Sequence, residues 1–368
     1  MEETNEFLLD DNFIGQTIAD DFKIISKIKT THQGDIYLAD QLSVKRKVTI
    51  KIYPIDKNEV SQSEDAQRFL REARIMAKLE HPNILNAIQV GQTDEFYYFV
   101  TEFEEVKLLK DIIAEKGALD EIVVLSMFLP LADALNHFWN ENKILHRDVK
   151  PNNMVITRDG KVKLINFQIA KPIGNVSADL TMSNFVLGTP EYMSPERLSG
   201  KKEINFSSDI YSFGVSMYHC LTGNPPFVNE NIVDLIESIE NGDIKPATKK
   251  NPAVSKEVSD FVAKLFKKSP EDRPSSWTEL INEGNKVLKK LKEKNSEDRQ
   301  MSAEESVLEL FGPIQSLTRQ EKSSDAENKE PQSIAEEDED DESIVNMPLL
   351  ISTIIIIVLF VAIYFLFF

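Results

Sequence analysis

The residues best suited to chemistry stand close together near the middle of the chain. The stretch 146–153 contains His146, Asp148, Lys150 and Asn153. A carboxylate can accept a proton, an ammonium group can neutralise an anion, and an amide oxygen can bind a hard cation. This stretch is therefore a candidate reaction site, provided that the fold holds the three kinds of group in place.

The pattern of apolar residues indicates which elements could hold them. Alternation predicts strands over residues 22–28, 35–39, 47–53 and 96–101. A helix is expected over about residues 63–79, and His81-Pro82-Asn83 ends it. From about residue 108 onward helical periods dominate, interrupted near residues 144–164 by short strand-like segments. The plan is a small β-rich half followed by a larger helical half.

The stretch His146-Arg147-Asp148-Val149-Lys150-Pro151-Asn152-Asn153 resembles the catalytic loop, HRDxxxxN, of eukaryotic-type protein kinases. Lys150 stands where the Ser/Thr branch of that family has its lysine. Other motifs of the family follow in the right order: Val48-Thr49-Ile50-Lys51, Glu72, Gly188-Thr189-Pro190-Glu191-Tyr192-Met193-Ser194-Pro195-Glu196, Asp209-Ile210-Tyr211-Ser212-Phe213-Gly214 and Arg273-Pro274. With the lead-in Ile14-Gly15-Gln16-Thr17-Ile18, the pattern is most similar to the bacterial Ser/Thr kinases.

The resemblance implies an α+β, bilobal protein kinase fold with a small β-rich N-lobe and a larger helical C-lobe. The N-lobe would cover about residues 22–101, the hinge 102–106 and the C-lobe 107–291, after an N-terminal extension of residues 1–21. The expected activity is transfer of the ATP γ-phosphate to a protein Ser or Thr, with ATP and Mg²⁺ as cofactors.

The same resemblance assigns roles to five residues. Lys51 would hold the α- and β-phosphates of ATP, and Glu72 would pair with Lys51. Asp148 would accept the proton of the substrate hydroxyl, and Lys150 would face the γ-phosphate. Asn153 would bind magnesium through its amide oxygen.

Further positions would surround the nucleotide or support the site. The nucleotide would be contacted by Gly34, Ile36 and the backbones of Glu102 and Glu104. Thr101 would be the gatekeeper residue before the hinge. A scaffold role is implied for Glu196 and Arg273, as a buried ion pair in the C-lobe, and for Asp209, which would brace the catalytic loop.

One departure from the family pattern concerns the metal. Where the family has Asp-Phe-Gly, this chain reads Asn166-Phe167-Gln168. Asn166 keeps an oxygen donor but lacks the negative charge that a hard cation prefers, so weakened Mg²⁺ binding is expected. Gln168 replaces a glycine, which should make the backbone stiffer there.

The second departure concerns the loop that covers the phosphates. The family pattern GxGxxG falls on Lys29, Thr31 and Gly34, so only the third glycine is present. The backbone is therefore expected to close less easily onto the phosphates, although Lys29 could contribute charge of its own.

Charge and cysteine content exclude some functional classes. The chain has 368 residues with 42 Lys+Arg and 61 Asp+Glu, giving a formal net charge of −19. Binding to nucleic acid is driven by Lys and Arg, so nucleic acid is not expected to be the main partner. The single cysteine, Cys220, cannot form an internal disulfide and stands among apolar residues, which is typical of a buried structural thiol.

The end of the sequence changes composition twice. Residues 321–345 contain eleven acidic residues and two lysines, and residues 292–346 are predicted to be an acidic, disordered linker. Residues 349–368 are apolar and uncharged, and a single transmembrane helix is predicted over 347–368. The N-terminus lacks the positive charge and apolar run of a secretory signal. A membrane-bound, tail-anchored protein with its kinase-like domain in the cytoplasm is therefore expected.

Two shorter segments leave their function open. Residues 303–311 could form a short amphipathic helix with Val307, Leu308 and Phe311 on one face, either docked on the C-lobe or touching lipid headgroups. A merely solvated helix face is the simpler interpretation. Ser177, Thr181 and Ser183 could be phosphorylated, with Arg147 as the cation that pairs with the phosphate.

Three hypotheses about function remain. The intact Lys51, Glu72, Asp148, Lys150 and Asn153 favour an active, if slow, protein Ser/Thr kinase that acts on a protein substrate. The changes at Asn166 and Gln168 and the missing glycines favour an ATP-binding regulatory pseudokinase that works through a protein partner at a membrane. The third hypothesis is a membrane-tethered adaptor that binds no nucleotide.

Overall fold

The computed structural model describes residues 13–31, 34–55, 64–172, 189–201, 204–295 and 307–310. The chain divides into two units, Met1–Pro313 and Ile314–Phe368, and every described residue lies in the first. The predicted membrane-spanning helix and the predicted acidic run at 321–345 lie outside the described residues.

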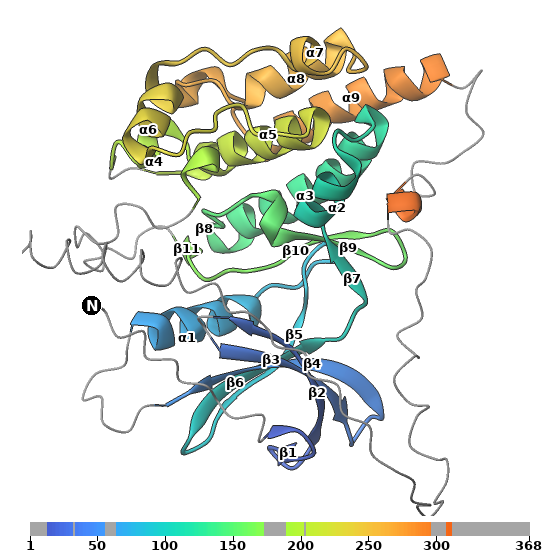
Figure 1. Ribbon diagram of the computed structural model, residues 1–368, viewed down its shortest axis with the longest axis vertical. Coiled ribbons are helices and arrows are strands. Elements are labelled where there is room, and N and C mark those ends of the chain that lie inside the picture. Colours follow the sequence, from blue (N-terminus) through green and yellow to red (C-terminus); the bar gives the residue numbers. More distant parts are fainter. Residues whose placement is uncertain are drawn as a thin grey trace, which may run out of the picture. The chain divides into compact units, whose positions relative to one another are not determined.

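An antiparallel sheet builds the N-lobe (Figure 1). Its strands follow the spatial order β1-β2-β3-β4-β6-β5. Their bounds are β1 Thr17–Ile18, β2 Phe22–Thr31, β3 Gly34–Gln41, β4 Arg46–Pro54, β5 Ala87–Gln92 and β6 Phe96–Glu102. All four predicted strands lie within β2, β3, β4 and β6, and the predicted helix corresponds to α1, Glu64–Met76.

Strand β6 is covered on both faces, which explains its continuous run of buried side chains from Phe96 to Thr101. Phe96 and Tyr98 of β6 join an apolar cluster on the outer face, which Phe13 also covers. Phe99, on the opposite face, packs against Phe69 of α1, with ring centroids 5.2 Å apart. A strand covered on both sides needs no alternation of apolar and polar residues.

Short strands connect the sheet to the catalytic loop. β7 (Val106–Leu108) pairs with β9 (Met154–Thr157), and β9 pairs with β10 (Val162–Leu164). A second pair joins β8 (Ile144–Leu145) to β11 (Lys171–Pro172). Between β8 and β9, residues Pro151–Asn153 form the 3-10 turn η2. The hinge, the catalytic loop and the segment containing Asn166 are thus held side by side.

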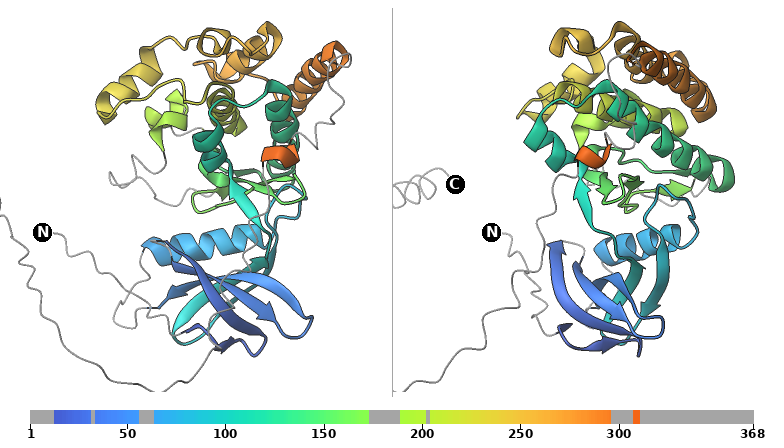
Figure 2. Two further views of the ribbon diagram at one scale, coloured as in Figure 1. Left: turned by 45° about the vertical axis from the view of Figure 1, so that its right-hand side comes forward. Right: turned by 90° about the vertical axis from the view of Figure 1, so that its right-hand side faces the viewer.

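Helices form the C-lobe, seen from two further directions in Figure 2. In chain order they are α2 Leu109–Lys116, α3 Glu121–Asn142, α4 Pro195–Leu198, α5 Phe206–Thr222, α6 Ile232–Asn241, α7 Ala247–Lys250, α8 Lys256–Leu265 and α9 Trp277–Asn295. Their starts follow capping rules, since Asp120 accepts from the Ile122 N–H at 2.9 Å and Asn205 accepts from the Ser207 N–H at 2.9 Å.

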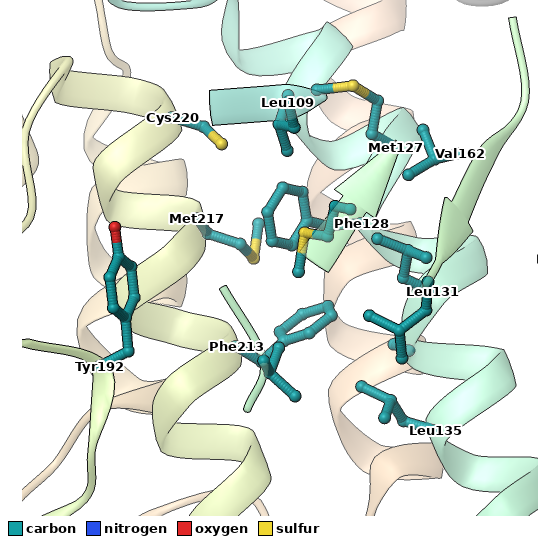
Figure 3. Packing of buried hydrophobic residues seen from close by; sticks show 14 of the residues in the cluster. Leu109, Met127, Phe128, Leu131, Leu135, Val162, Tyr192, Phe213, Met217 and Cys220 are labelled. Atoms are coloured by element: carbon teal, nitrogen blue, oxygen red, sulfur yellow. The ribbon is translucent and has the colours of Figure 1, made fainter. Parts of the chain in front are cut away.

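The C-lobe core is formed by α3, α5 and α9: α3 packs on both of the other helices, and Trp277 of α9 contacts Phe213 of α5, with ring centroids 5.5 Å apart. Figure 3 shows Phe128 of α3 and Phe213 of α5 edge to face, with ring centroids 5.1 Å apart. Cys220 is fully buried in the same cluster, as its sequence context predicts, and burial raises the pKa of its thiol. Among the described residues, one helix, α3, is long and apolar enough to span a membrane. Most of its side chains are buried in this core.

Part of the predicted linker is ordered, which corrects its start at residue 292. Helix α9 continues to Asn295, and residues 307–310 form a helical turn whose Val307 and Leu310 are buried. The sequence has apolar side chains spaced three apart at these two positions, which is enough to bury one face of a single turn.

Candidate active site

The predicted lysine–glutamate pair is formed. Lys51 of β4 and Glu72 of α1 are both buried, and the Nζ–Oε2 distance is 2.8 Å. The other carboxylate oxygen of Glu72 accepts the backbone N–H of Phe167 at 3.4 Å. The pair therefore fixes α1 against the sheet and also against the segment that contains Asn166.

Asp209 braces the catalytic loop through hydrogen bonds to its backbone, as predicted. Its carboxylate accepts the backbone N–H groups of His146, at 2.8 Å, and of Arg147, at 2.9 Å. Arg147 has φ +65°, a left-handed conformation that is unfavourable for an arginine and must be held by its surroundings. Arg197 of α4 donates to the carbonyl oxygen of Arg147, so both ends of this residue are bonded.

Asp148 is surrounded by donors. Lys150 lies with its Nζ 2.9 Å from the Asp148 carboxylate and donates to the Thr189 hydroxyl at 2.6 Å. Asn153 donates through its amide to the Asp148 carboxylate at 2.6 Å. Asp148 and the two loop residues predicted beside it are thus brought together within the C-lobe.

The two candidate metal ligands are bonded to each other. The Asn166 Nδ2 donates to Asn153 Oδ1 at 3.0 Å, and Asn166 Oδ1 accepts the Gln168 N–H at 3.4 Å. Asn166 has φ +68°, a left-handed conformation that asparagine tolerates better than most residues. Gln168, by contrast, does not have positive φ, so the side chain that replaces the family's glycine causes no backbone strain here.

This arrangement fits Mg²⁺ poorly. Both amide oxygens are neutral and already accept hydrogen bonds, whereas Mg²⁺ favours charged oxygen ligands in octahedral geometry. The nearby Asp148 carboxylate is engaged by Lys150 and Asn153. Over the part of the chain that the structure describes, no group of three or more acidic, His or Cys side chains is placed to hold a metal.

Gly34 is needed by the sheet. It has φ +102°, and a Cβ built on it would lie 2.0 Å from the carbonyl oxygen of Ile52. The Thr31 hydroxyl donates to the Gly34 carbonyl at 2.7 Å, so β2 and β3 are tied beside the tip of the loop. Close packing against β4 is thus sufficient reason for a glycine at this position.

The other predicted nucleotide contacts lie on β3, β6 and the hinge. Ile36 is paired directly with Lys51 across β3 and β4, so the two residues share one face of the sheet. Glu102 ends β6, and the side chain of Glu104 is held by Lys163 of β10. Thr101 is buried and paired with Thr49 across β4 and β6.

His146 supports the catalytic loop through its buried ring, which contacts Phe167 and bonds the Asp148 backbone. Its ring is fully buried, 4.9 Å from the ring of Phe167, and burial lowers the pKa of the imidazole. The neutral Nδ1 accepts the Asp148 N–H at 3.3 Å. His146 thus connects the buried Phe167 to the backbone of Asp148.

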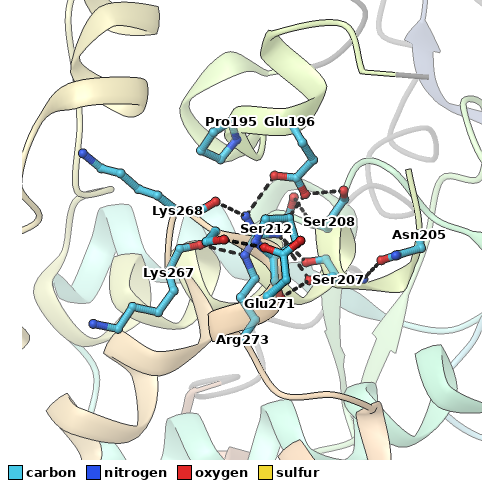
Figure 4. Close-up of polar contacts among 12 residues, drawn as sticks. Pro195, Glu196, Asn205, Ser207, Ser208, Ser212, Lys267, Lys268, Glu271 and Arg273 are labelled. Carbon is cyan, nitrogen blue, oxygen red and sulfur yellow. Dashed lines mark hydrogen bonds and ion pairs between the residues drawn. The ribbon is translucent and has the colours of Figure 1, made fainter. Parts of the chain in front are cut away.

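The predicted ion pair of the C-lobe is bidentate and fully enclosed (Figure 4). Arg273 Nη1 and Nη2 lie 2.8 and 2.9 Å from the two carboxylate oxygens of Glu196, and the Ser208 hydroxyl donates to the same carboxylate at 2.5 Å. Burial alone would raise the pKa of Glu196, but the bonds from Arg273 and Ser208 outweigh it and leave the pKa below its ordinary value.

Sequence reasoning missed three contacts of the site. These are the Arg197 bond to Arg147, the Lys150 bond to Thr189 and the amide bond between Asn166 and Asn153. Each joins segments far apart in the chain through side-chain direction, which spacing alone does not reveal. The candidate phosphorylation sites Ser177, Thr181 and Ser183 lie outside the described residues.

Comparison with known proteins agrees with this geometry. The protein kinase domain family matches residues 22–285. Serine/threonine-protein kinase PrkC of Bacillus subtilis is 33% identical over 260 residues, covering 71% of this chain and 39% of the relative. Serine/threonine-protein kinase PknB of Mycobacterium tuberculosis is 31% identical over 251 residues, covering 67% and 40%. The chain thus matches about two fifths of the length of these relatives.

Proposed function

The chain belongs to the protein kinase family, and on that premise we propose that it is an ATP-binding regulatory pseudokinase that binds nucleotide with little dependence on magnesium. The observation that carries this proposal is the 3.0 Å bond from Asn166 Nδ2 to Asn153 Oδ1. An amide N–H here occupies the oxygen that the family offers to the metal, and neither asparagine carries a negative charge that would attract a cation.

Retained residues support binding of the nucleotide itself. Lys51, oriented by Glu72, supplies a fixed positive charge for the phosphates without any metal. Ile36 and Thr49 lie on the same sheet face as Lys51, where a base can pack. These features argue against an adaptor that binds no nucleotide, because a buried charge pair is costly to keep without a function for it.

A second candidate function is slow phosphoryl transfer to a protein Ser or Thr. Asp148 is placed to accept a hydroxyl proton, and Lys150 connects it to Thr189 at 2.9 and 2.6 Å. The proximity of these three groups favours residual chemistry, whose rate is limited by the missing carboxylate at Asn166.

Nucleotide-dependent stabilisation of the chain tests the main proposal. With ATP at about 100 times its Kd, unfolding should be opposed by about 2.7 kcal/mol, and adding magnesium should change this little. Lys51→Met should abolish the effect, whereas Lys47→Met, an exposed lysine on the same strand, should not. Thermal unfolding with ATP, with ATP and Mg²⁺, and with neither is the measurement. An obligatory magnesium requirement would contradict the proposal, and absence of any ATP effect would favour the adaptor.

We also propose that residues 347–368 anchor the protein in a membrane with the kinase domain in the cytoplasm. Deletion of residues 349–368 should move the protein into the soluble fraction, since each central Leu, Ile or Phe favours insertion by about 0.3–0.6 kcal/mol. Deletion of residues 321–345, which leaves the apolar segment in place, serves as the control. Fractionation of cell lysates is the measurement, and membrane recovery of the shortened protein would contradict the anchor.

A further inference from the structure

A short segment beyond the last long helix returns to the C-lobe. Residues 307–310, hereafter the strap, form a helical turn in which Val307 is 3% exposed and Leu310 is 7% exposed. Both side chains belong to the main apolar cluster, which also contains Ile112 and Ile113 of α2. Leu308, between them, is 39% exposed and does not belong to this cluster. Figures 1 and 2 show the strap next to α2 and the β9–β10 hairpin.

A polar contact fixes the strap at the end of α2. The Lys116 Nζ donates to the backbone carbonyl oxygen of Glu309 at 3.0 Å. Carbonyls in the last turn of a helix lack partners within the helix, so a lysine donor satisfies one of them. Lys116 is the last residue of α2, and the Gly117 N–H bonds back to the Ile113 carbonyl at 2.8 Å. The lysine therefore projects from a well-terminated helix.

α2 lies directly against the catalytic loop. It follows β7 without a break, and β7 pairs with β9, which starts where η2 ends. α2 also packs on η2 itself, and η2 contains Asn153. A continuous path of packed elements thus runs from the strap through α2 to the residue that bonds both Asp148 and Asn166.

We propose that the end of α2 is a docking surface for the chain's own strap, and that docking is coupled to the nucleotide site through η2. The occupant is the strap because the Glu309 carbonyl accepts from Lys116, and Val307 and Leu310 are buried in the apolar cluster to which α2 also contributes. The sequence after the strap leads into the acidic run at 321–345 and the apolar segment at 349–368. Undocking of the strap would loosen the catalytic loop, because α2 packs on η2. By reciprocity, nucleotide in the cleft would strengthen docking.

Hydrogen exchange of the full-length chain tests docking without requiring any nucleotide. In Val307→Ser/Leu310→Ser, the amides of α2 (109–116) and of Asn152 and Asn153 in η2 should exchange about fivefold faster or more than in the wild type. Leu308→Ser is the matched control and should leave both rates unchanged, because Leu308 is exposed and does not belong to the cluster. Unchanged protection of α2 in the double variant would overturn docking, and faster exchange in α2 alone would overturn the coupling to η2.

Lys116→Met provides a variant that cannot fail for lack of a folded core, since the lysine is exposed. It should increase exchange in the strap, whereas Lys110→Met, also exposed on α2, should not. The nucleotide part rests on the proposed function: the double variant should bind ATP about fivefold more weakly than the wild type. Equal ATP affinity in the two would overturn the coupling. If neither binds ATP while the exchange differences remain, the proposed function fails and the docking inference stands.

Discussion

Asn166→Asp is expected to convert the site into a magnesium-dependent one and to raise phosphoryl transfer by roughly 10² to 10⁴-fold. The estimate takes the restored charge to contribute about 3–5 kcal/mol, as for a buried charge pair, with each 1.36 kcal/mol worth a factor of ten in rate. The new carboxylate would face Asn153 Oδ1 across a gap that now holds a 3.0 Å hydrogen bond. Two oxygen acceptors at that distance repel each other unless a cation lies between them.

Two measurements follow from this repulsion. Without metal, Asn166→Asp should be less stable to heat than the wild type, and Mg²⁺ with ATP should restore its stability more than ATP alone. Transfer of label from γ-labelled ATP to a Ser/Thr peptide should appear or increase. Asn152→Asp is the matched control, because Asn152 is an exposed neighbour in the same loop and adds the same charge away from Asn153.

The gain in transfer should vanish in Asn166→Asp/Asp148→Asn, which lacks the proton acceptor. Asp148-dependent transfer by the wild type itself would contradict the pseudokinase proposal and favour the slow kinase. If Asn166→Asp remains inactive, the departures at Lys29 and Thr31 also prevent catalysis.

Arg273→Met is expected to destabilise the fold by about 3–5 kcal/mol, because it leaves the Glu196 carboxylate buried without its cation. The guanidinium also donates to the carbonyls of Lys267 and Lys268 at 2.7 and 2.9 Å, so its loss leaves backbone acceptors unpaired as well. Thermal unfolding should show a fall in Tm on the order of 10 °C. Lys256→Met, which removes an exposed ion pair with Asp260, should leave Tm nearly unchanged, because an exposed pair is screened by solvent.

The double variant Arg273→Met/Glu196→Leu should recover part of the loss, since it removes both charges. The free energy of unfolding of the wild type, measured relative to that of this double variant, should also depend on pH. Because the folded-state pKa of Glu196 is lowered, its contribution is complete above the unfolded pKa of about 4.3 and is lost as pH falls through the folded-state value. The wild type should therefore lose stability relative to the double variant as pH falls. A wild type that gains stability relative to the double variant toward acid pH would contradict the lowered pKa of Glu196.

The strands that the sequence predicts are those whose side chains pack regularly into a core. β3 alternates between buried and half-buried side chains over its whole length, and β6 has buried aromatic or aliphatic side chains from Phe96 to Val100. β5, by contrast, was not predicted, because Val90 and both of its glutamines are exposed or half-exposed and no alternation remains. Its pairing with β6 is set by the neighbouring strand rather than by its own residues.

Of the candidate site, the sequence could predict which residues meet but not how they are bonded. Lys51 pairs with Glu72, and Asn153 bonds Asp148, as the motif spacing implies. The mutual bond of two asparagine amides depends on the rotation of each side chain and on the left-handed backbone at Asn166, neither of which follows from residue type. The stiffer backbone expected at Gln168 stays a prediction, and the positive φ of this segment lies two residues earlier, at Asn166.

For the strap, too, the sequence did not determine which side chains of the helical turn are buried. The sequence prediction grouped Val307 with Leu308 and Phe311, whereas the structure buries Val307 with Leu310. Both choices are compatible with a helical period over so short a segment, and only the surface of the C-lobe distinguishes them.

The close approach of Gly34 to Ile52 determines how the loop above the cleft can be studied. Any side chain at position 34 would push β3 away from β4, the strand that carries Lys51, so a loss of ATP binding in such a variant would report a displaced sheet and not a missing loop contact. Mutagenesis aimed at the loop should therefore change Lys29 or Thr31 and leave the glycine intact. For the same reason, the presence of Gly34 is not by itself a sign of nucleotide binding, because its packing against Ile52 already requires a glycine.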